Sequence, residues 1–374
     1  MKSNFKKAMA MTAAVAASAV LMAACAQPAP SAPASAAPAE APAAPAEAPA
    51  DPEPSGAEVE FPTRDISVVV PWGPGGETDL TVRTLTNEMA NFWGITMPIT
   101  NMAGAGGSVG LAEVHNQTPD GYTILGTSAA ALANAQVLGL VDVSYREWHG
   151  WAATFSPNVV VVRADSPFQT IDDLVDAMTA NPGSITGASA GPGSSGHLGA
   201  VVFAEGVGAE FLHIPYEGGA AAIIGTLAGE VDFNAQLSSE MIDYLRSGDL
   251  RGLAALTEED LVITGGIDGD VIIPSILNYA PGMTNVVPFG GVFGLYVHED
   301  THPDVLASID EAYQFALTTD SMAAYIQERG LVLFGFDREQ TAAYLETTAS
   351  IVNWTLYDIG SAHVSPEYLG IPRP

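Results

Sequence analysis

Short apolar strands followed at once by a glycine-rich loop and then a helix recur along this chain, and this alternation limits its fold most. Residues 66–70 form a β-branched run that stops at Pro71. A glycine-rich loop follows, and apolar residues then recur at helical spacing from Leu80 to Met89. The same pattern returns over residues 97–117. It predicts an α/β fold with a largely parallel sheet, in which ligands lie at the carboxyl ends of strands.

The loop at residues 73–79 is the first candidate site. It places three glycines directly before a helix whose N-cap is predicted at Thr78 or Asp79. Glycines expose backbone N–H groups, and a helix start offers unpaired donors with partial positive charge. The loop therefore predicts an anion site, and the alternative is a tight turn that binds nothing. The candidate ligand-binding residues are Trp72, Gly75, Gly76, Glu77, Thr78 and Asp79.

Further loops follow the later strands. Residues 103–108 have the same glycine-rich build, and two such loops at the ends of neighbouring strands are expected to face one point. Thr127 and Ser128 end a third predicted strand and offer hydroxyl groups, with simple helix capping as the alternative. Residues 191–197 supply a facing loop, or a flexible surface loop. The candidates added here are Ala103, Gly104, Ala105, Gly106, Gly107, Ser108, Thr127 and Ser128.

Two enzyme-like motifs overlap this facing loop and fit poorly. Residues 191–196 match the dinucleotide fingerprint G-x-G-x-x-G, but Pro192 removes an amide and no acidic residue ends a following strand. Residues 187–191 match the nucleophile elbow G-x-S-x-G around Ser189, with Asp232 and His298 in the chain order of a hydrolase. The flanking segments are weak as a strand and a helix. A serine hydrolase that uses Ser189 is therefore a minor alternative.

Metal and cofactor chemistry is not expected. The seven histidines show no H-E-x-x-H or other paired metal spacing and are interpreted as solvated or capping residues. Cys25 is the single cysteine, so disulfides and thiol catalysis are excluded. We expect no metal ion, no cofactor and no catalytic residue.

The N-terminal part predicts export. Residues 1–24 combine lysines with a short apolar run and are interpreted as a lipoprotein signal, with Cys25 as the lipid attachment site. A plain secretory signal is the alternative. Residues 25–60 are rich in Ala and Pro and are predicted to be a disordered tether. The rest exceeds one typical core, so two lobes are predicted: residues 61–163 with 289–374, and residues 164–288.

The strongly negative net charge of the chain argues against nucleic acid and anionic lipid surfaces as partners. All three lysines lie in the predicted signal, so its removal takes the formal net charge from −31 to −34, with nine arginines against 43 acidic residues. Such a field repels nucleic acid and anionic lipid surfaces. A lysine-free, acid-rich surface also suits high salt, which screens self-repulsion. A halophilic source is therefore a hypothesis.

An ordered series of short motifs resembles the substrate-binding proteins of tripartite tricarboxylate transporters, the TctC or Bug family. The series includes Val70-Pro71-Trp72, Gly104-Ala105-Gly106-Gly107, Pro119-Asp120-Gly121-Tyr122, Gly193-Ser194-Ser195-Gly196-His197 and His213-Ile214-Pro215-Tyr216. The resemblance implies a type II periplasmic-binding-protein fold, with two α/β lobes around a ligand cleft. It also implies a monomeric, non-catalytic receptor that delivers a small carboxylate or amino-acid-like ligand to a membrane permease. A ligand sensor for a signalling partner remains an alternative.

The same resemblance implies further ligand-binding residues and shows where this sequence differs from the family. It implies ligand contacts by Ser189, Gly193, Ser194 and Asp232. Glu77 stands where the family usually has a small residue, and Glu217 where it often has lysine. If either faces the cleft, a ligand with an amine beside its carboxylate is favoured. The preferred interpretation is that both point to solvent.

Overall fold

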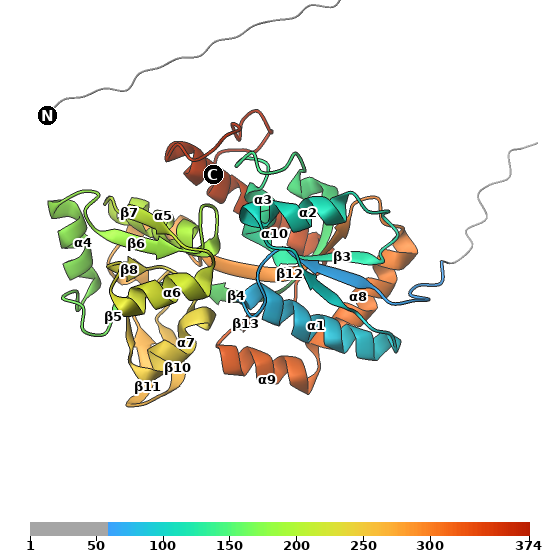
Figure 1. Cartoon of the computed structure of the whole chain (residues 1–374), viewed down its shortest axis with the longest axis horizontal. Coiled ribbons are helices and arrows are strands. Elements are labelled where there is room, and N and C mark those ends of the chain that lie inside the picture. The colour runs from blue at the N-terminus through green and yellow to red at the C-terminus, as the bar shows by residue number, and fades with distance from the viewer. Residues whose placement is uncertain (1–58) are drawn as a thin grey trace, which may run out of the picture. The chain divides into compact units, whose positions relative to one another are not determined.

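The computed structural model describes residues 59–374. The predicted signal, the predicted lipid attachment site Cys25 and nearly all of the predicted tether lie outside the described residues. Within the described part, two β-sheets each carry their own helices, and a separate hairpin joins β10 (Leu261–Gly266) to β11 (Gly269–Ile273) (Figure 1). Among residues 59–374, no helix combines the length and apolarity that a bilayer span requires.

The first sheet has six strands. Their order is β13 (Val332–Leu333), β4 (Trp148–Pro157), β12 (Gly290–His298), β3 (Thr123–Ser128), β1 (Ser67–Val70) and β2 (Ile99–Asn101). Its helices are α1 (Glu77–Trp93), α2 (Ser108–His115), α3 (Ala129–Asn134), α8 (Pro303–Leu317), α9 (Asp320–Arg329) and α10 (Arg338–Asp358).

The β-branched run in β1 explains why this sheet is covered on both faces. Val68 and Val70 pack with α1 and α8, whereas Val69 packs with α3 and α10. Successive side chains of a strand point to opposite faces, so a continuous apolar run needs helices on both sides. As predicted, β1 pairs in parallel with both β2 and β3.

The second sheet has five strands. Their order is β7 (Leu212–Pro215), β6 (Thr186–Ser189), β8 (Phe233–Asn234), β5 (Val159–Arg163) and β9 (Leu250–Ala255). Its helices are α4 (Ile171–Ala180), α5 (Ser195–Val207), α6 (Gly219–Ala228) and α7 (Ser238–Ser247). Val160 and Val162 face α4 and α5, and the alternate valines of β5 face α6 and α7.

The prediction of largely parallel sheets is wrong. Pairing is antiparallel at β12 with β3 and β4, at β13 with β4, and at β5 with β8 and β9. The reason is that the chain passes between the sheets twice, through β4 into β5 and back into β12. These passages lie side by side, since the Asn158 N–H donates to the Phe289 carbonyl at 3.0 Å. The predicted lobe limits remain a prediction, although β5 already pairs within the second sheet.

Candidate ligand-binding site

A pocket of about 230 Å³ lies where loops from the two sheets meet. Strands β1, β6, β7 and β8 end beside it, and each is followed by a helix that begins there: α1, α5, α6 and α7. The N-cap residues of these helices, Gly76, Ser194, Gly218 and Leu237, all line the pocket. Gly76, Gly218 and Leu237 make no side-chain cap hydrogen bond. The positive ends of four helix dipoles therefore converge on one cavity, although the Ser239 N–H of α7 donates to Ser156 and the His197 N–H of α5 donates to Ser194.

Hydrogen bonds to the buried Asp79 carboxylate fix the conformation of the loop between β1 and α1. The buried Asp79 carboxylate accepts hydrogen bonds from the Gly75 N–H and the side chains of Arg83 and Asn101, each at 2.9 Å. Asn101 also donates to the Trp72 carbonyl at 3.0 Å. Burial alone would raise the pKa of Asp79, but these hydrogen bonds outweigh it and the pKa is lowered. Asp79 therefore shapes the loop from the back and does not line the pocket.

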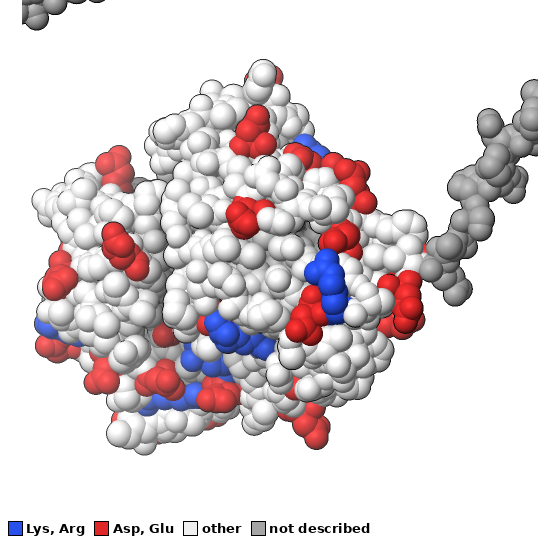
Figure 2. All heavy atoms as spheres, turned by 45° about the vertical axis from the view of Figure 1, so that its right-hand side comes forward, with Lys and Arg blue, Asp and Glu red and all other residues white. Residues whose placement is uncertain are grey.

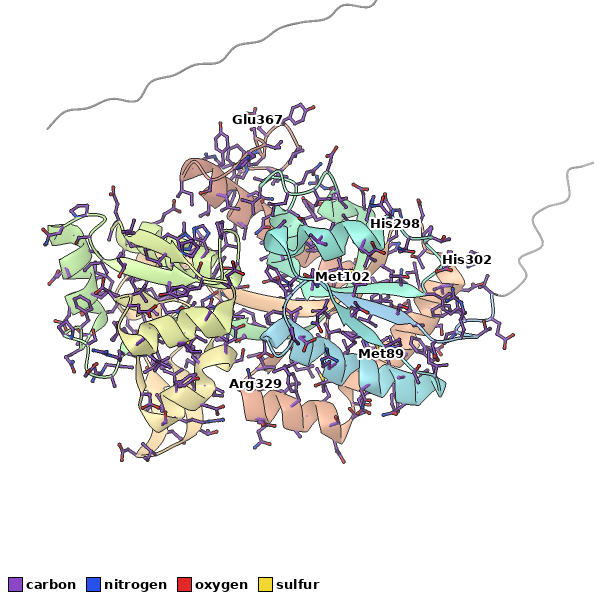
Figure 3. The ribbon with its side chains drawn as sticks, in the orientation of Figure 1. Met89, Met102, His298, His302, Arg329 and Glu367 are labelled. Atoms are coloured by element: carbon purple, nitrogen blue, oxygen red, sulfur yellow. The ribbon has the colours of Figure 1, made fainter. Side chains whose placement is uncertain are left out.

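Glu77 begins helix α1, with Gly76 as the N-cap, so the predicted cap at Thr78 or Asp79 is wrong. The Glu77 side chain is buried, and its carboxylate lies 3.1 Å from the Arg329 guanidinium. It also accepts a hydrogen bond from the Tyr325 hydroxyl. Arg329 ends helix α9, which packs beside α1 (Figure 3). The interpretation that Glu77 points to solvent is therefore wrong, because an internal cation already neutralises its charge.

The glycine-rich loop after β2 does not line the pocket. It packs behind Trp72 instead, since a Cβ at Gly107 would lie 3.2 Å from the Trp72 ring. Strand β2 is the edge strand of its sheet, one strand farther from the pocket than β1. The loop that follows it therefore opens beside the pocket rather than into it, and residues 103–108 support Trp72 from the side.

The facing loop after β6 contacts helix α3 of the first sheet at Gly193. Its carbonyl accepts a hydrogen bond from the Asn134 side chain at 3.0 Å, and its φ of 76° favours glycine. A Cβ there would also lie 2.6 Å from Leu138. The Gly193 N–H donates to the His197 ring at 3.2 Å, and burial lowers the pKa of His197 to about 4. Neutral His197 can therefore accept this bond and fix the loop.

The structure does not bring together Ser189, Asp232 and His298, the three residues that the hydrolase alternative requires. Ser189 is fully buried, and its hydroxyl lies 2.7 Å from Nε2 of His213 rather than near the predicted partners. Asp232 accepts hydrogen bonds from the N–H and hydroxyl of Thr186, and His298 lies in the first sheet. A buried hydroxyl without an approach for a substrate cannot act as the nucleophile of an esterase. Ser189 and Asp232 also stay outside the pocket lining.

Acidic side chains line the pocket on the second sheet. Glu217 is exposed at its mouth, and Glu240 projects from α7 and accepts a hydrogen bond from Gln236 at 3.1 Å. Burial, followed by the negative charge of Glu77, raises the pKa of Glu240 to about 7. Among the described residues that line the pocket, none is lysine, arginine or histidine.

The predicted site therefore divides into two groups. The predicted residues that line the pocket are Trp72, Gly76, Glu77, Thr78, Ser128, Gly193 and Ser194. Those that lie outside the lining are Gly75, Asp79, residues 103–108, Thr127, Ser189 and Asp232. The main omissions are residues 218–221 and Gln236, Leu237 and Glu240, whereas Glu217, named from the sequence as a departure, also lines the pocket. They follow two further strand-to-helix junctions, which the alternation pattern alone could have indicated.

Comparison with known proteins agrees with this architecture. The model of the TctC family, described as tripartite tricarboxylate transporter family receptor, matches residues 81–353. A UPF0065 protein of Pseudomonas sp. (strain P51) is 37% identical over 177 residues, 46% of this chain and about half (52%) of the relative's length.

Two solved structures share the fold. The periplasmic binding protein BugD has a TM-score of 0.69 at 23% identity, covering 81% of this chain and 99% of that chain. MatC from Rhodopseudomonas palustris with bound malate has a TM-score of 0.71 at 21% identity, covering 79% of this chain and 100% of that chain. The periplasmic-binding-protein fold and the family resemblance predicted from the motifs are both confirmed.

Proposed function

This chain belongs to the tripartite tricarboxylate transporter receptor family, and from that premise we propose that it captures a small carboxylate-bearing solute in the pocket between its two sheets, without chemistry on it. Members of the family are solute-binding receptors. The role proposed for the pocket residues is to bind the solute and to hold the two sheets together around it.

The four helix N-termini around one cavity are the observation that carries this proposal. The Ser239 N–H of α7 already donates to Ser156, so the donors come mainly from α1, α5 and α6, and a charge-assisted hydrogen bond contributes about 1.5–3 kcal/mol. A few converging donors would offset the desolvation of one carboxylate in spite of the acidic surroundings. The fold relative MatC, solved with malate, lends further support.

We propose that the ligand also carries an amine. Glu217 and Glu240 line the pocket and, among residues 59–374, no basic side chain does, so the second charge of a plain dicarboxylate would lie beside the Glu217 carboxylate without a cationic partner. An ammonium group would pair with those carboxylates while the helix N-termini hold the carboxylate. This arrangement favours a zwitterionic, amino-acid-like ligand.

Delivery of the ligand to a tripartite tricarboxylate transporter-type permease is the role proposed for the whole protein, outside the cytoplasm and anchored through Cys25. The monomeric state is part of the same proposal. A sensor that reports to a signalling partner would use the same pocket, and transport assays with a tripartite tricarboxylate transporter-type permease separate the two roles.

Native mass spectrometry for a co-purified ligand, followed by thermal shift and calorimetric titration, tests the pocket. Two matched variants isolate the N–H donors. Gly76→Pro removes one N–H where φ is −76°, which the proline ring accepts, and Gly76→Ala keeps it, with only the Gly73 carbonyl at 3.8 Å from the new Cβ. We expect Gly76→Pro to weaken binding about 10- to 100-fold and Gly76→Ala to change it little. No shift with any carboxylate would overturn the proposal.

Pairs of acids that differ only in the amine test the ligand class. Aspartate should stabilise the protein more than succinate, and glutamate more than glutarate. The Glu217→Gln/Glu240→Gln variant should lose this preference while it still binds carboxylates. A stronger response to succinate than to aspartate would refute the amine and leave carboxylate binding intact.

A further inference from the structure

Two histidines from distant parts of the chain meet at the end of the first sheet that lies away from the pocket. His298 ends β12, whereas Phe293, five residues earlier on the same strand, lines the pocket. At about 3.3 Å per residue, this separation is about 17 Å along the strand. Figure 3 shows His298 well away from Arg329, which pairs with Glu77 beside the pocket.

The cluster joins three elements. His115 ends α2, Glu147 ends the short 3₁₀ helix Tyr145–Glu147, and His298 ends β12. One ligand atom from each residue lies within 4.8 Å of the other two. Nε2 of His115 is 2.8 Å from a carboxylate oxygen of Glu147, and the two imidazole rings are 5.0 Å apart. The side chains are 18–33% exposed, so an ion can enter while the donors stay partly shielded.

Neighbouring groups orient these donors. One oxygen of Glu147 accepts the Ser144 N–H at 2.7 Å, which leaves the other oxygen for the cluster. The Glu147 carbonyl accepts the Glu299 N–H at 2.8 Å, which ties the 3₁₀ helix to the end of β12. Nδ1 of His298 accepts the Asp300 N–H at 3.2 Å, so Nε2 is the nitrogen left for the cluster.

We propose that His115, Glu147 and His298 bind one divalent transition-metal ion of the zinc class. Two imidazoles and one carboxylate are a donor set that Zn²⁺ and Cu²⁺ accept, whereas Ca²⁺ and Mg²⁺ require mostly oxygen ligands. Tetrahedral bonds of about 2 Å place donor atoms about 3.3 Å apart, within reach of side-chain rotation from the observed spacing.

An acidic side chain beside the cluster, Asp300, also favours binding of a cation. Binding of the metal through Nε2 requires the proton to sit on Nδ1, so Nδ1 would give up the hydrogen bond from the Asp300 N–H and donate instead to the Asp300 carboxylate, which lies 3.7 Å away. A carboxylate behind a metal-bound imidazole raises the basicity of the ligand and fixes the ring. The metal would replace the His115–Glu147 hydrogen bond and link α2, the 3₁₀ helix and β12. The open fourth position would hold water.

Titration of the untagged full chain with ZnCl₂, followed by calorimetry and native mass spectrometry, tests the site. We expect one Zn²⁺ per chain, and at least tenfold weaker binding in His115→Gln and His298→Gln. The matched control is His302→Asn, which removes an imidazole 3.6 Å from a carboxylate but keeps a helix N-cap. Equal losses in the control, or no stoichiometric binding, would overturn the proposal.

A second measurement does not depend on the histidine variants folding. The buried Trp148 ring lies 5.8 Å from the His115 ring and 6.4 Å from the His298 ring. Cu²⁺ bound at the cluster should therefore quench Trp148 fluorescence, and Trp148→Phe should lose most of that quenching while it binds Zn²⁺ as before. Quenching that is the same in Trp148→Phe would place the ion elsewhere and refute the site.

Discussion

The Arg329 guanidinium lies 3.1 Å from the carboxylate of Glu77, whose side chain is completely buried at the start of α1. Tyr325 adds a hydroxyl donor from the same helix α9, and Thr81 lies within hydrogen-bond distance of both side chains. A buried carboxylate needs such partners because desolvation strongly disfavours an isolated charge. Arg329 therefore neutralises the Glu77 carboxylate inside the protein, and Glu77 is not available to pair with a ligand.

Removing Arg329 should be costly. Arg329→Met leaves the buried Glu77 without its cation and is expected to lower the free energy of unfolding by about 3 kcal/mol, measured by urea denaturation. Glu77→Leu/Arg329→Met removes both charges, while Tyr325 keeps Thr81 as a partner, and should recover most of the loss. If the double variant is as unstable as the single one, the ion pair does not carry this stability.

The raised pKa of Glu240 predicts that the free energy of unfolding falls as pH rises. Its folded-state pKa of about 7 exceeds the ordinary value of 4.5, so the folded protein binds more protons and the free energy of unfolding falls as pH rises between these values. Glu240→Gln cannot ionise and should lose this dependence. Relative to the natural protein, the variant should gain about 1–3 kcal/mol between pH 5 and pH 8. A difference that stays constant with pH would contradict the assignment.

Local patterns predicted the units of this fold well. The apolar run of β1 and the helical spacing from Leu80 to Met89 in α1 follow from neighbours in sequence, and the structure confirms them. Strand order was not accessible in the same way. It depends on which strands the two passages between the sheets bring together, and no local signal encodes that pairing.

Only part of the ligand-binding site was predicted, because local sequence signals do not encode which strands lie next to one another. Ser194, a candidate through the family resemblance, lines the pocket as the N-cap of α5, a helix that the sequence pattern marked only weakly. The position of each strand in the sheet decided which loop lines the pocket. The loop after the edge strand β2 is glycine-rich like the loop after β1, yet it opens beside the pocket. Two contacts join residues that are far apart in sequence: the ion pair of Glu77 with Arg329, and the contact of His115 with His298. Rules based on residue spacing could not predict such contacts.

Ser189 tests the hydrolase alternative directly. We expect no labelling by a fluorophosphonate probe, because the hydroxyl is fully buried and already bonded to His213. Ser189→Ala should lose that hydrogen bond, at about 1 kcal/mol of stability, and retain solute binding. Labelling that disappears in Ser189→Ala would establish a reactive serine and contradict the non-catalytic proposal.

Salt should stabilise this protein strongly. Figure 2 shows acidic side chains scattered over the visible face with few basic ones among them, as expected from 43 acidic residues and nine arginines. Repulsion among them acts over about 10 Å at 0.1 M salt but only about 3 Å at 1 M. We therefore expect Tm at pH 7 to rise steeply with KCl up to molar concentrations. At pH 4, where many carboxylates are protonated, the rise should be much smaller. A Tm that ignores KCl at pH 7 would contradict the high-salt hypothesis, whereas an equal rise at both pH values would assign the effect to something other than carboxylate repulsion.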